Sequence, residues 1–311
     1  MKFSRILGRP MSIHRLSHID AFTREKFSGN SAGVVHDARG LQEETMARIA
    51  VELKHSETVF LFPSDDPHYD YLFRYFTCGG NEVPVCGHAT IAGVYVAATR
   101  LRQDIQSLLI KTGAGILPMN VERMGSETKV VMTQGKIEFG KTIEGQERAK
   151  LLKALGITEQ DLDPHCPIQI VSTGHSKVMI GIKEQQLLHR LAPDMPSLSS
   201  LSNRIGCNGY FVFTFDSSDP AILTHGRMFA PKIGIMEDPV TGNANGPLGA
   251  YIVHHRLRPA NGTFFSFIGQ QGEAMKRKGQ VEVRVHIQNN QPVKVQIAGY
   301  AMPVLEADLS V

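Results

Sequence analysis

Two stretches of the sequence share one pattern and carry most of its polar chemistry. Residues 82–89 and residues 237–244 both read Glu-x-Pro-Val-x-Gly-x-Ala. Each copy follows an expected strand that opens with Arg-x-Phe and precedes an expected helix rich in small residues. Because the period is about half the chain, the repeat predicts two similar halves and not an array of short units. At the variable positions the first copy has His88 and the second has Asp238, so two facing halves can divide the chemistry of one cleft.

The shared pattern is suited to presenting backbone N–H groups to an anion. Proline fixes its own φ, glycine allows close approach, and the first turn of the following helix has unpaired N–H groups at the positive end of its dipole. We therefore expect Gly87 and Ala89 in the first copy, and Gly242 and Asn243 in the second, to bind a substrate carboxylate or an enolate-like charge. A turn used only for packing is the alternative for either copy alone.

A further candidate, Glu57, lies between an expected helix and an expected strand. Apolar residues at helical spacing predict a helix over 41–53 that ends near Lys54, and residues 59–62 form an apolar strand. A carboxylate at this junction is drawn toward the interior, where desolvation favours its protonated form, so Glu57 is a candidate acid/base. An exposed glutamate at a helix end is the alternative, and the junction by itself favours that alternative.

Two basic residues, His175 and Lys177, lie in an expected turn between strands at 168–172 and 178–182. They could contact a substrate carboxylate or be solvated, and the sequence favours neither interpretation.

The cysteines indicate neither a disulfide framework nor a zinc site. No C-x-x-C occurs among the four, which are Cys78, Cys86, Cys166 and Cys207. A metal set of Cys78, Cys86 and His88 lacks further ligands at close spacing, so we expect no metal.

Composition excludes several classes of partner. The chain has 311 residues, enough for two domains, with a net charge of +3 and no tryptophan. The basic run 276–278 is flanked by glycines and is expected to be a solvated hairpin tip, so no nucleic acid is expected as a partner. No apolar run is long enough to span a membrane, so no membrane partner and a cytoplasmic location are expected. Residues 1–10 are expected to be disordered or pendant.

The order of the expected elements favours an α+β fold. Further helices are predicted over 145–155 and 198–205, and each copy of the repeat is followed by a helix, to about residue 99 and about residue 255. Strands are predicted over 13–22, 69–77, 107–117, 129–133, 210–215, 263–268, 280–286, 293–297 and 300–306. A strand-rich chain with one strong helix per repeat fits barrels wrapped on a helix better than a doubly wound parallel sheet.

Three motifs together resemble the PhzF (phenazine biosynthesis) family, which has the diaminopimelate epimerase-like fold. They are His55-Ser56-Glu57-Thr58, the stretch of Glu82 and Cys86-Gly87-His88-Ala89-Thr90, and Glu237-Asp238-Pro239-Val240-Thr241-Gly242. The runs 173–180, 206–209 and 242–247 resemble one bacterial branch of that family. The resemblance extends from about residue 11 to the C-terminus.

The resemblance implies two pseudo-symmetric domains, each a β-barrel around a central helix, with the active site between them. The first domain would span 11–130 and the second 131–294, with a strand at 295–311 returning to the first. The catalytic residues of the family fall on Glu57, His88 and Asp238. This implied role replaces the interpretation of Glu57 as an exposed residue at a helix end. The resemblance also implies proton chemistry without a cofactor, and a homodimer.

The sequence departs from the family pattern at two places. Asn243 stands where the family commonly has serine, which keeps a hydrogen-bonding side chain but changes its reach. The loop at 78–80 is longer than in the family. In related epimerases two cysteines form the base pair; Cys86 matches the first, but the second falls near Asp238. We therefore interpret Cys86 as a small buried residue.

The sequence thus predicts an isomerase or epimerase that moves a proton on a small carboxylated metabolite, with Glu57 as the acid/base. Two alternatives come from other classes. A small-molecule-binding protein without catalytic activity could retain the same cleft, and metal-dependent hydrolysis would lack ligands.

Overall fold

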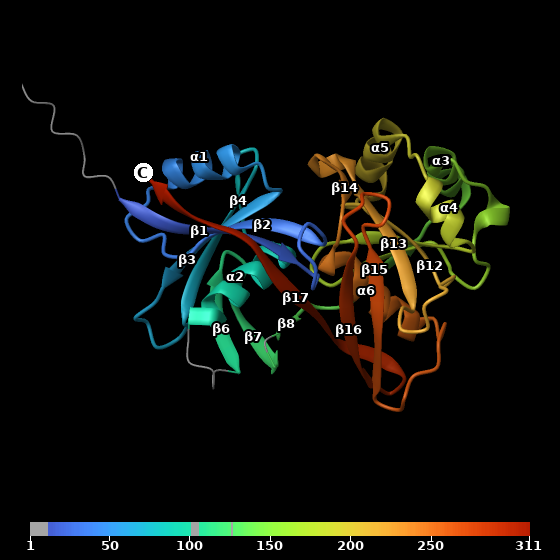
Figure 1. Ribbon diagram of the computed structural model, residues 1–311. Coiled ribbons are helices and arrows are strands. Elements are labelled where there is room, and N and C mark those ends of the chain that lie inside the picture. The colour runs from blue at the N-terminus through green and yellow to red at the C-terminus, as the bar shows by residue number, and fades with distance from the viewer. Residues whose placement is uncertain (1–11, 101–105, 126) are drawn as a thin grey trace, which may run out of the picture.

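Two helices of small residues each lie against a ring of strands, and the two assemblies sit side by side (Figure 1). This computed structural model describes residues 12–100, 106–125 and 127–311. The helices are α2 (Gly87–Arg100) and α6 (Gly242–His254), and they follow the two copies of the repeat, as predicted. Glycine permits the close wrapping: a Cβ at Gly93 would lie 2.8 Å from the Phe73 ring, and one at Gly249 would lie 2.6 Å from Val283.

Eight strands close into a barrel around α2. Each strand in the order below is hydrogen-bonded to the next, and the last is bonded to the first. The order is β1 (Ile13–Ala21), β2 (Asn30–Val35), β3 (Glu57–Pro63), β4 (Tyr71–Thr77), β6 (Ser107–Thr112), β7 (Gly115–Met124), β8 (Glu127–Thr133) and β17 (Gln291–Ser310), with β5 (Glu82–Val83) beside β4.

The second set of strands repeats this topology around α6. In both halves two strands that precede the central helix pair in parallel with each other, and the last long strand before that helix pairs in parallel with the strand that follows it. The predicted α+β fold with two pseudo-symmetric, epimerase-like barrel domains is therefore confirmed. The strands are β9 (Glu138–Thr142), β10 (Gln169–Ser172), β11 (Lys177–Ile182), β12 (Tyr210–Thr214), β13 (Thr224–Ala230), β14 (Ile235–Asp238), β15 (Phe264–Gln271), β16 (Gly279–Gln288) and the first part of β17.

β17 connects the two halves. Its N-terminal part pairs with β16, its middle with β8 and its C-terminal part with β1. On this pattern we propose the division of the chain after residue 130 that the sequence predicts, with the C-terminal strand returning to the first domain.

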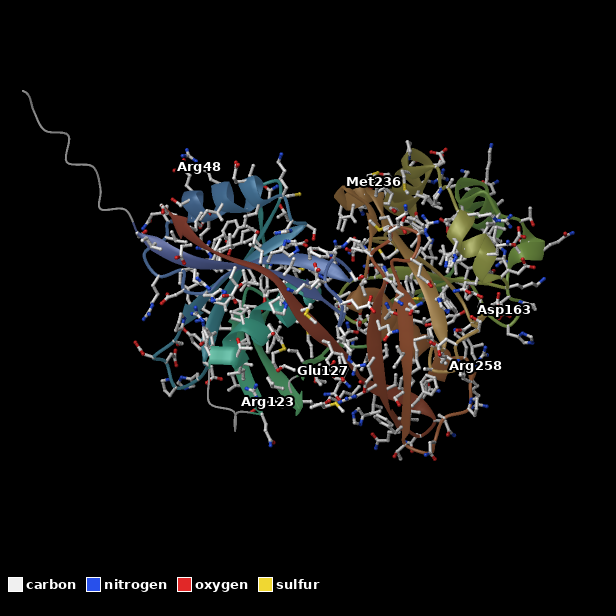
Figure 2. All side chains as sticks on the ribbon, in the orientation of Figure 1. Arg48, Arg123, Glu127, Asp163, Met236 and Arg258 are labelled. Atoms are coloured by element: carbon white, nitrogen blue, oxygen red, sulfur yellow. The ribbon has the colours of Figure 1, made fainter. Side chains whose placement is uncertain are left out.

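Four helices lie outside the barrels: α1 (Glu43–Leu53), α3 (Gly145–Leu155), α4 (Gln185–Arg190) and α5 (Met195–Ile205), with short 3₁₀ turns at Glu159–Asp161 and Pro231–Ile233. α1 packs on β3 and β4, and Figure 2 shows Arg48 pointing away from that barrel. Arg48 pairs with Glu44 one turn earlier. The polar face is therefore in solvent, as the helical pattern predicts.

The boundaries of some elements differ from the prediction. α5 begins three residues early because Asp194 accepts a hydrogen bond from the Ser197 N–H and caps the helix. The strand predicted over 107–117 is a hairpin of β6 and β7, since Gly115 takes a φ of 114° at the turn. The closing strands predicted separately are one strand, β17. α4 was not predicted, because six residues are too few to show a helical period.

One basic residue expected in solvent joins the two halves. The run 276–278 lies between β15 and β16, and Lys276 and Lys278 are exposed as predicted. Arg277 is not: its Nη2 donates to Asp20 Oδ1 at 2.7 Å, and its Nε donates to the Gly29 carbonyl at 3.0 Å. The local run could not indicate a partner about 250 residues away.

In the described part of the chain, every helix is too short or too polar to span a bilayer. The predicted pendant segment, residues 1–10, lies outside the described residues.

Candidate active site

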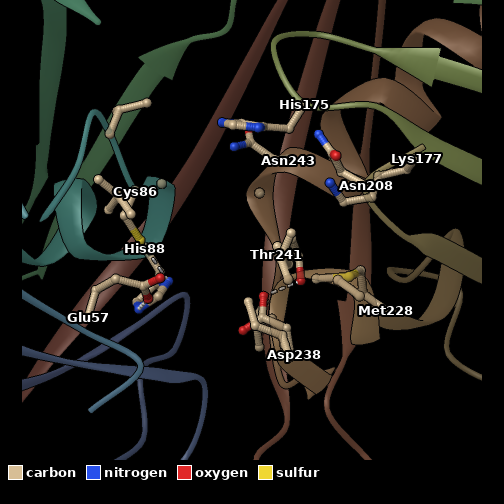
Figure 3. Close-up of a pocket in the computed structure, with 18 of the residues that line it drawn as sticks. Glu57, Cys86, His88, His175, Lys177, Asn208, Met228, Asp238, Thr241 and Asn243 are labelled. Atoms are coloured by element: carbon tan, nitrogen blue, oxygen red, sulfur yellow. Dashed lines mark hydrogen bonds and ion pairs between the residues drawn. The ribbon is translucent and has the colours of Figure 1, made fainter. Parts of the chain in front are cut away.

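The two copies of the repeat open onto one cavity of about 310 Å³. Figure 3 shows Glu57, Cys86 and His88 on one wall, facing a second wall with Asp238 and Thr241. The cavity is lined from both halves by Glu57, Val83, Pro84, Val85, Cys86, Gly87, His88, His175, Lys177, Asn208, Met228, Ala230, Ile233, Ile235, Asp238, Val240, Thr241, Gly242 and Asn243. A concave site with few convergent polar groups is typical of small-molecule binding.

Glu57 is held at the cavity by the local structure that the sequence predicts. α1 ends at Lys54, which takes the left-handed conformation, and Glu57 is the first residue of β3. Its side chain is 14% exposed, so the alternative of a solvated glutamate is wrong. Glu57 Oε2 lies 3.4 Å from His88 Nε2, and Ser56 Oγ lies 3.2 Å from the same nitrogen. His88 therefore orients the carboxylate, Ser56 holds His88, and the carboxylate lines the cavity.

Cys86 completes this wall. Its Sγ lies 3.4 Å from His88 Nδ1, and the thiol lines the cavity, so the interpretation of Cys86 as only a small buried residue is incomplete. Burial, and then the charge of Glu57, raise the pKa of the Cys86 thiol well above its ordinary value. A protonated thiol is a poor proton acceptor, which favours the carboxylate as the base.

The same three residues are the one group in the described ranges whose atoms are close enough to share a metal ion. The ligand atoms of Glu57, Cys86 and His88 lie within 4.8 Å of one another. The set considered from the sequence was different, because it contained Cys78, which is exposed and is not in this group.

Asp238 on the opposite wall is buried and bound by two donors. Asn30 Nδ2 donates to its Oδ1 at 2.8 Å, and Thr241 Oγ1 donates to its Oδ2. Burial raises the pKa of Asp238, while the positive charge of His88 and these hydrogen bonds oppose the rise. Asn30 comes from the first half of the chain and Thr241 from the second, so both halves hold the Asp238 carboxylate at the shared cavity.

The helix N-termini lie at the cavity as predicted. Gly87 and Gly242 are the first residues of α2 and α6, where N–H groups have no helical acceptor. A Cβ at Gly87 would meet nothing within 4 Å, so its backbone is open to a ligand. Ala89 was also predicted to bind substrate, but its side chain is fully buried and is not part of the cavity lining.

Gln134, which the sequence did not indicate, orients Asn243. Its Nε2 donates to Asn243 Oδ1 at 2.9 Å and to the Gly242 carbonyl at 3.1 Å, and its Oε1 accepts from Thr173 Oγ1 at 2.8 Å. With Oδ1 occupied, the amide Nδ2 of Asn243 is left as a donor for the cavity. Gly246 makes room, since a Cβ there would collide with Gln134 Oε1.

The rest of the second wall comes from the turn before β11 and its first residue, from the turn before β12, and from β13. His175 and Lys177 both line the cavity, but they differ in exposure to solvent. His175 is exposed, as the solvated interpretation expects, whereas Lys177 is buried. Asn208 and Met228 also line the cavity and were missed. A signal existed for Asn208, because it lies in one of the motifs typical of the bacterial branch.

Asn30→Ala should destabilise the fold because it removes two hydrogen bonds to buried acceptors. Asn30 is 2% exposed and donates both to Asp238 and to the Val240 carbonyl at 2.9 Å. Leaving such groups unpaired costs about 1–3 kcal/mol. Urea unfolding measures this loss; Asn120→Ala, at an exposed position of β7, is the control and should change little. A loss as small as that of the control would show that Asn30 does not hold Asp238.

A protein-family model decides the family. Residues 19–307 match PhzC-PhzF, described as phenazine biosynthesis-like protein. The chain belongs to this family. The resemblance stated from the motifs is thereby confirmed, over nearly the whole of the chain that carries them.

The relatives of this PhzF-family chain are named as isomerases. An uncharacterised isomerase of Clostridium acetobutylicum is 53% identical over 95% of this chain and 98% of its own. The uncharacterised isomerase YddE of Escherichia coli is 46% identical over 94% and 97%. A trans-2,3-dihydro-3-hydroxyanthranilate isomerase of Pseudomonas aeruginosa is 30% identical over 79% and 82%. The chain is accordingly an isomerase.

Solved structures agree. A Bacillus anthracis phenazine biosynthesis protein of the PhzF family superimposes with a TM-score of 0.87 at 33% identity, covering 96% of this chain and all of the other.

Proposed function

We propose that this isomerase moves a proton between positions on a small carboxylated substrate and that Glu57 carries the proton. One observation supports this most: a half-buried carboxylate lines the cavity 3.4 Å from an imidazole nitrogen, and the first residues of α2 and α6 line the same cavity. General acid/base transfer needs a proton carrier that is oriented and shielded from bulk water.

The other residues hold the substrate and the charge that develops on it. Removing a proton next to a carboxylate leaves an enolate-like charge, and the N–H groups that begin α2 and α6 are placed to stabilise that charge. His88 orients Glu57, and Asp238 accepts a substrate N–H or O–H group or adjusts the charge on Glu57. Asn243 offers its amide donor, and His175 lies at the cavity entrance.

Exchange with solvent deuterium tests the proposal. A carboxylated metabolite mixture incubated with the protein in D2O should give at least one compound that gains deuterium at carbon, read by mass spectrometry and NMR. Heat-denatured protein is the control. A protein that binds one of these compounds without any exchange would instead be a binding protein that retains the cleft.

Carboxylate ligands should protect the protein against heat far better than the corresponding amides. Only the anion gains from the dipoles of α2 and α6, which supports a difference of at least tenfold in Kd between, for example, butyrate and butyramide. Differential scanning fluorimetry across a concentration series measures this. Equal shifts in Tm for the two compounds would contradict an anion site at the helix N-termini.

Chelation should leave the activity intact, because the proposed chemistry uses Glu57 and His88 as proton-handling groups and assigns no step to a metal. The measurement is deuterium exchange before and after dialysis against EDTA. Zinc added to the dialysed protein should not increase the rate; a loss on dialysis that zinc restores would assign Glu57, Cys86 and His88 to a metal centre.

A further inference from the structure

Lys177 is a buried lysine that pairs with no acidic side chain of the described residues. It begins β11 and is 4% exposed. Its one hydrogen bond is a long contact of 3.3 Å from Nζ to the carbonyl of the adjacent Ser176. Among the described residues no carboxylate lies within ion-pair distance of it. Removing a charge from water without a partner costs free energy. The stability of the fold therefore does not explain why a lysine occupies this position.

The cavity is where a partner for Lys177 could come from. Lys177 lines it and, among the described lining residues, has the only side chain of the lysine or arginine type. The two lining carboxylates are engaged elsewhere: Asp238 accepts from Asn30 and Thr241, and Glu57 lies beside His88. Asp238 nevertheless acts on Lys177: burial lowers the pKa of the ammonium group, and Cys207 and then Asp238 oppose this.

The fold around Lys177 fixes its side chain in place. Gly209 allows the aliphatic stem to pack on the backbone, since a Cβ there would lie 3.3 Å from Lys177 Cδ and 2.8 Å from the Phe229 carbonyl oxygen. The Val178 N–H bonds to the Gly209 carbonyl at 2.9 Å. Asn208, one residue before Gly209, also lines the cavity and offers an amide donor. The group is therefore preorganised and is not a mobile surface lysine.

We infer that Lys177, with Asn208, binds a second carboxylate of the substrate, so that the natural substrate is a small dicarboxylate. This inference rests on the proposed function, which assigns the first carboxylate to the N-termini of α2 and α6. The two anion sites are distinct: one is made of backbone N–H groups, the other of a buried side-chain cation. A cavity of about 310 Å³ limits such a diacid to a small metabolite.

Binding of diacids and their monoamides tests the inference without requiring turnover. The probes are succinate, glutarate and adipate, each compared with its own monoamide, because the series covers a range of separations between the two carboxylates. For the best length, the wild-type protein should bind the diacid on the order of tenfold to hundredfold more tightly than the monoamide. Lys177→Met should reduce this ratio to near one while leaving the affinity for the monoamide almost unchanged.

Two control variants distinguish recognition of the second carboxylate by Lys177 from a general effect of the protein's positive charge. Lys183→Met removes the same charge from an exposed lysine outside the cavity and should keep the wild-type ratio. Lys177→Gln keeps a hydrogen-bond donor and should lose most of the ratio, which gives a second variant if Lys177→Met folds poorly. In the wild-type protein, the diacid should also protect Lys177 from acetylation by acetic anhydride, read by peptide mass mapping, and the monoamide should protect it less.

Three results would overturn the inference: no preference for any diacid in the wild-type protein, a preference that survives in Lys177→Met, or acetylation of Lys177 that the diacid does not reduce. These outcomes do not depend on the proposed proton transfer. Glu57→Gln should keep the diacid preference, so a failure of the Glu57 assignment and a failure of the Lys177 assignment give different results.

Discussion

Glu57→Gln is expected to abolish exchange of substrate hydrogen with D2O while the protein keeps its fold and its ligand affinity. Glutamine has nearly the same shape as glutamate and can keep the contact with His88, but it cannot accept and return a proton. General acid/base groups contribute about 10²- to 10⁴-fold to a rate, so the exchange rate should fall by at least the lower figure. Deuterium exchange, Tm and thermal protection by a carboxylate ligand provide the three measurements.

The variants of the neighbouring residues should behave differently from Glu57→Gln. His88→Asn and Asp238→Asn should weaken ligand binding as well as turnover, because both are assigned to holding the substrate and setting the charge on Glu57. If Glu57→Gln retains near-normal exchange and Cys86→Ala is inactive, the thiol is the base and the assignment of Glu57 is wrong.

Asp238→Asn should stabilise the fold near neutral pH while turnover falls. Burial raises the pKa of Asp238 above its ordinary value of 3.8, so ionising this residue costs more in the folded state than in the unfolded state. Asparagine avoids that cost: its amide oxygen can accept from Asn30, and its NH2 group can donate to Thr241 Oγ1 in place of the bond that the carboxylate accepts. The free energy of unfolding of Asp238→Asn at neutral pH should therefore be higher than that of the wild-type protein.

The sign of the pH dependence follows from proton binding. Between 3.8 and the raised pKa, folded Asp238 binds more protons than unfolded Asp238, so its contribution to stability falls as the pH rises through that window. The advantage of Asp238→Asn should therefore be absent below pH 3.8 and grow above it, in urea unfolding at a series of pH values.

Asp194→Asn provides a control of opposite sign for this measurement. Hydrogen bonds from Ser197 lower the pKa of Asp194, so its contribution is present above its unfolded pKa and is lost as the pH falls. A difference between Asp238→Asn and the wild-type protein that does not change with pH would contradict the account of Asp238 as a buried ionisable group.

The sequence by itself determined the elements and the chemical groups that depend on short stretches of chain. The two copies of Glu-x-Pro-Val-x-Gly-x-Ala predicted two similar halves and the helices that begin at Gly87 and Gly242. Glu57 was located at its junction because the end of α1 and the start of β3 are both local signals. Motifs of this kind are readable because propensity, caps and turn chemistry act over a few residues.

Only the tertiary structure decided which groups are buried and which groups they meet. Asn30 reaches Asp238 across 208 positions of sequence, and Arg277 reaches Asp20 across 257. Lys177 was equally compatible with solvent or with a ligand until the packing of β11 against Gly209 placed it inside the cavity. Burial and the pairing of charges arise from contacts between distant segments, and no periodicity or motif within one segment contains that information.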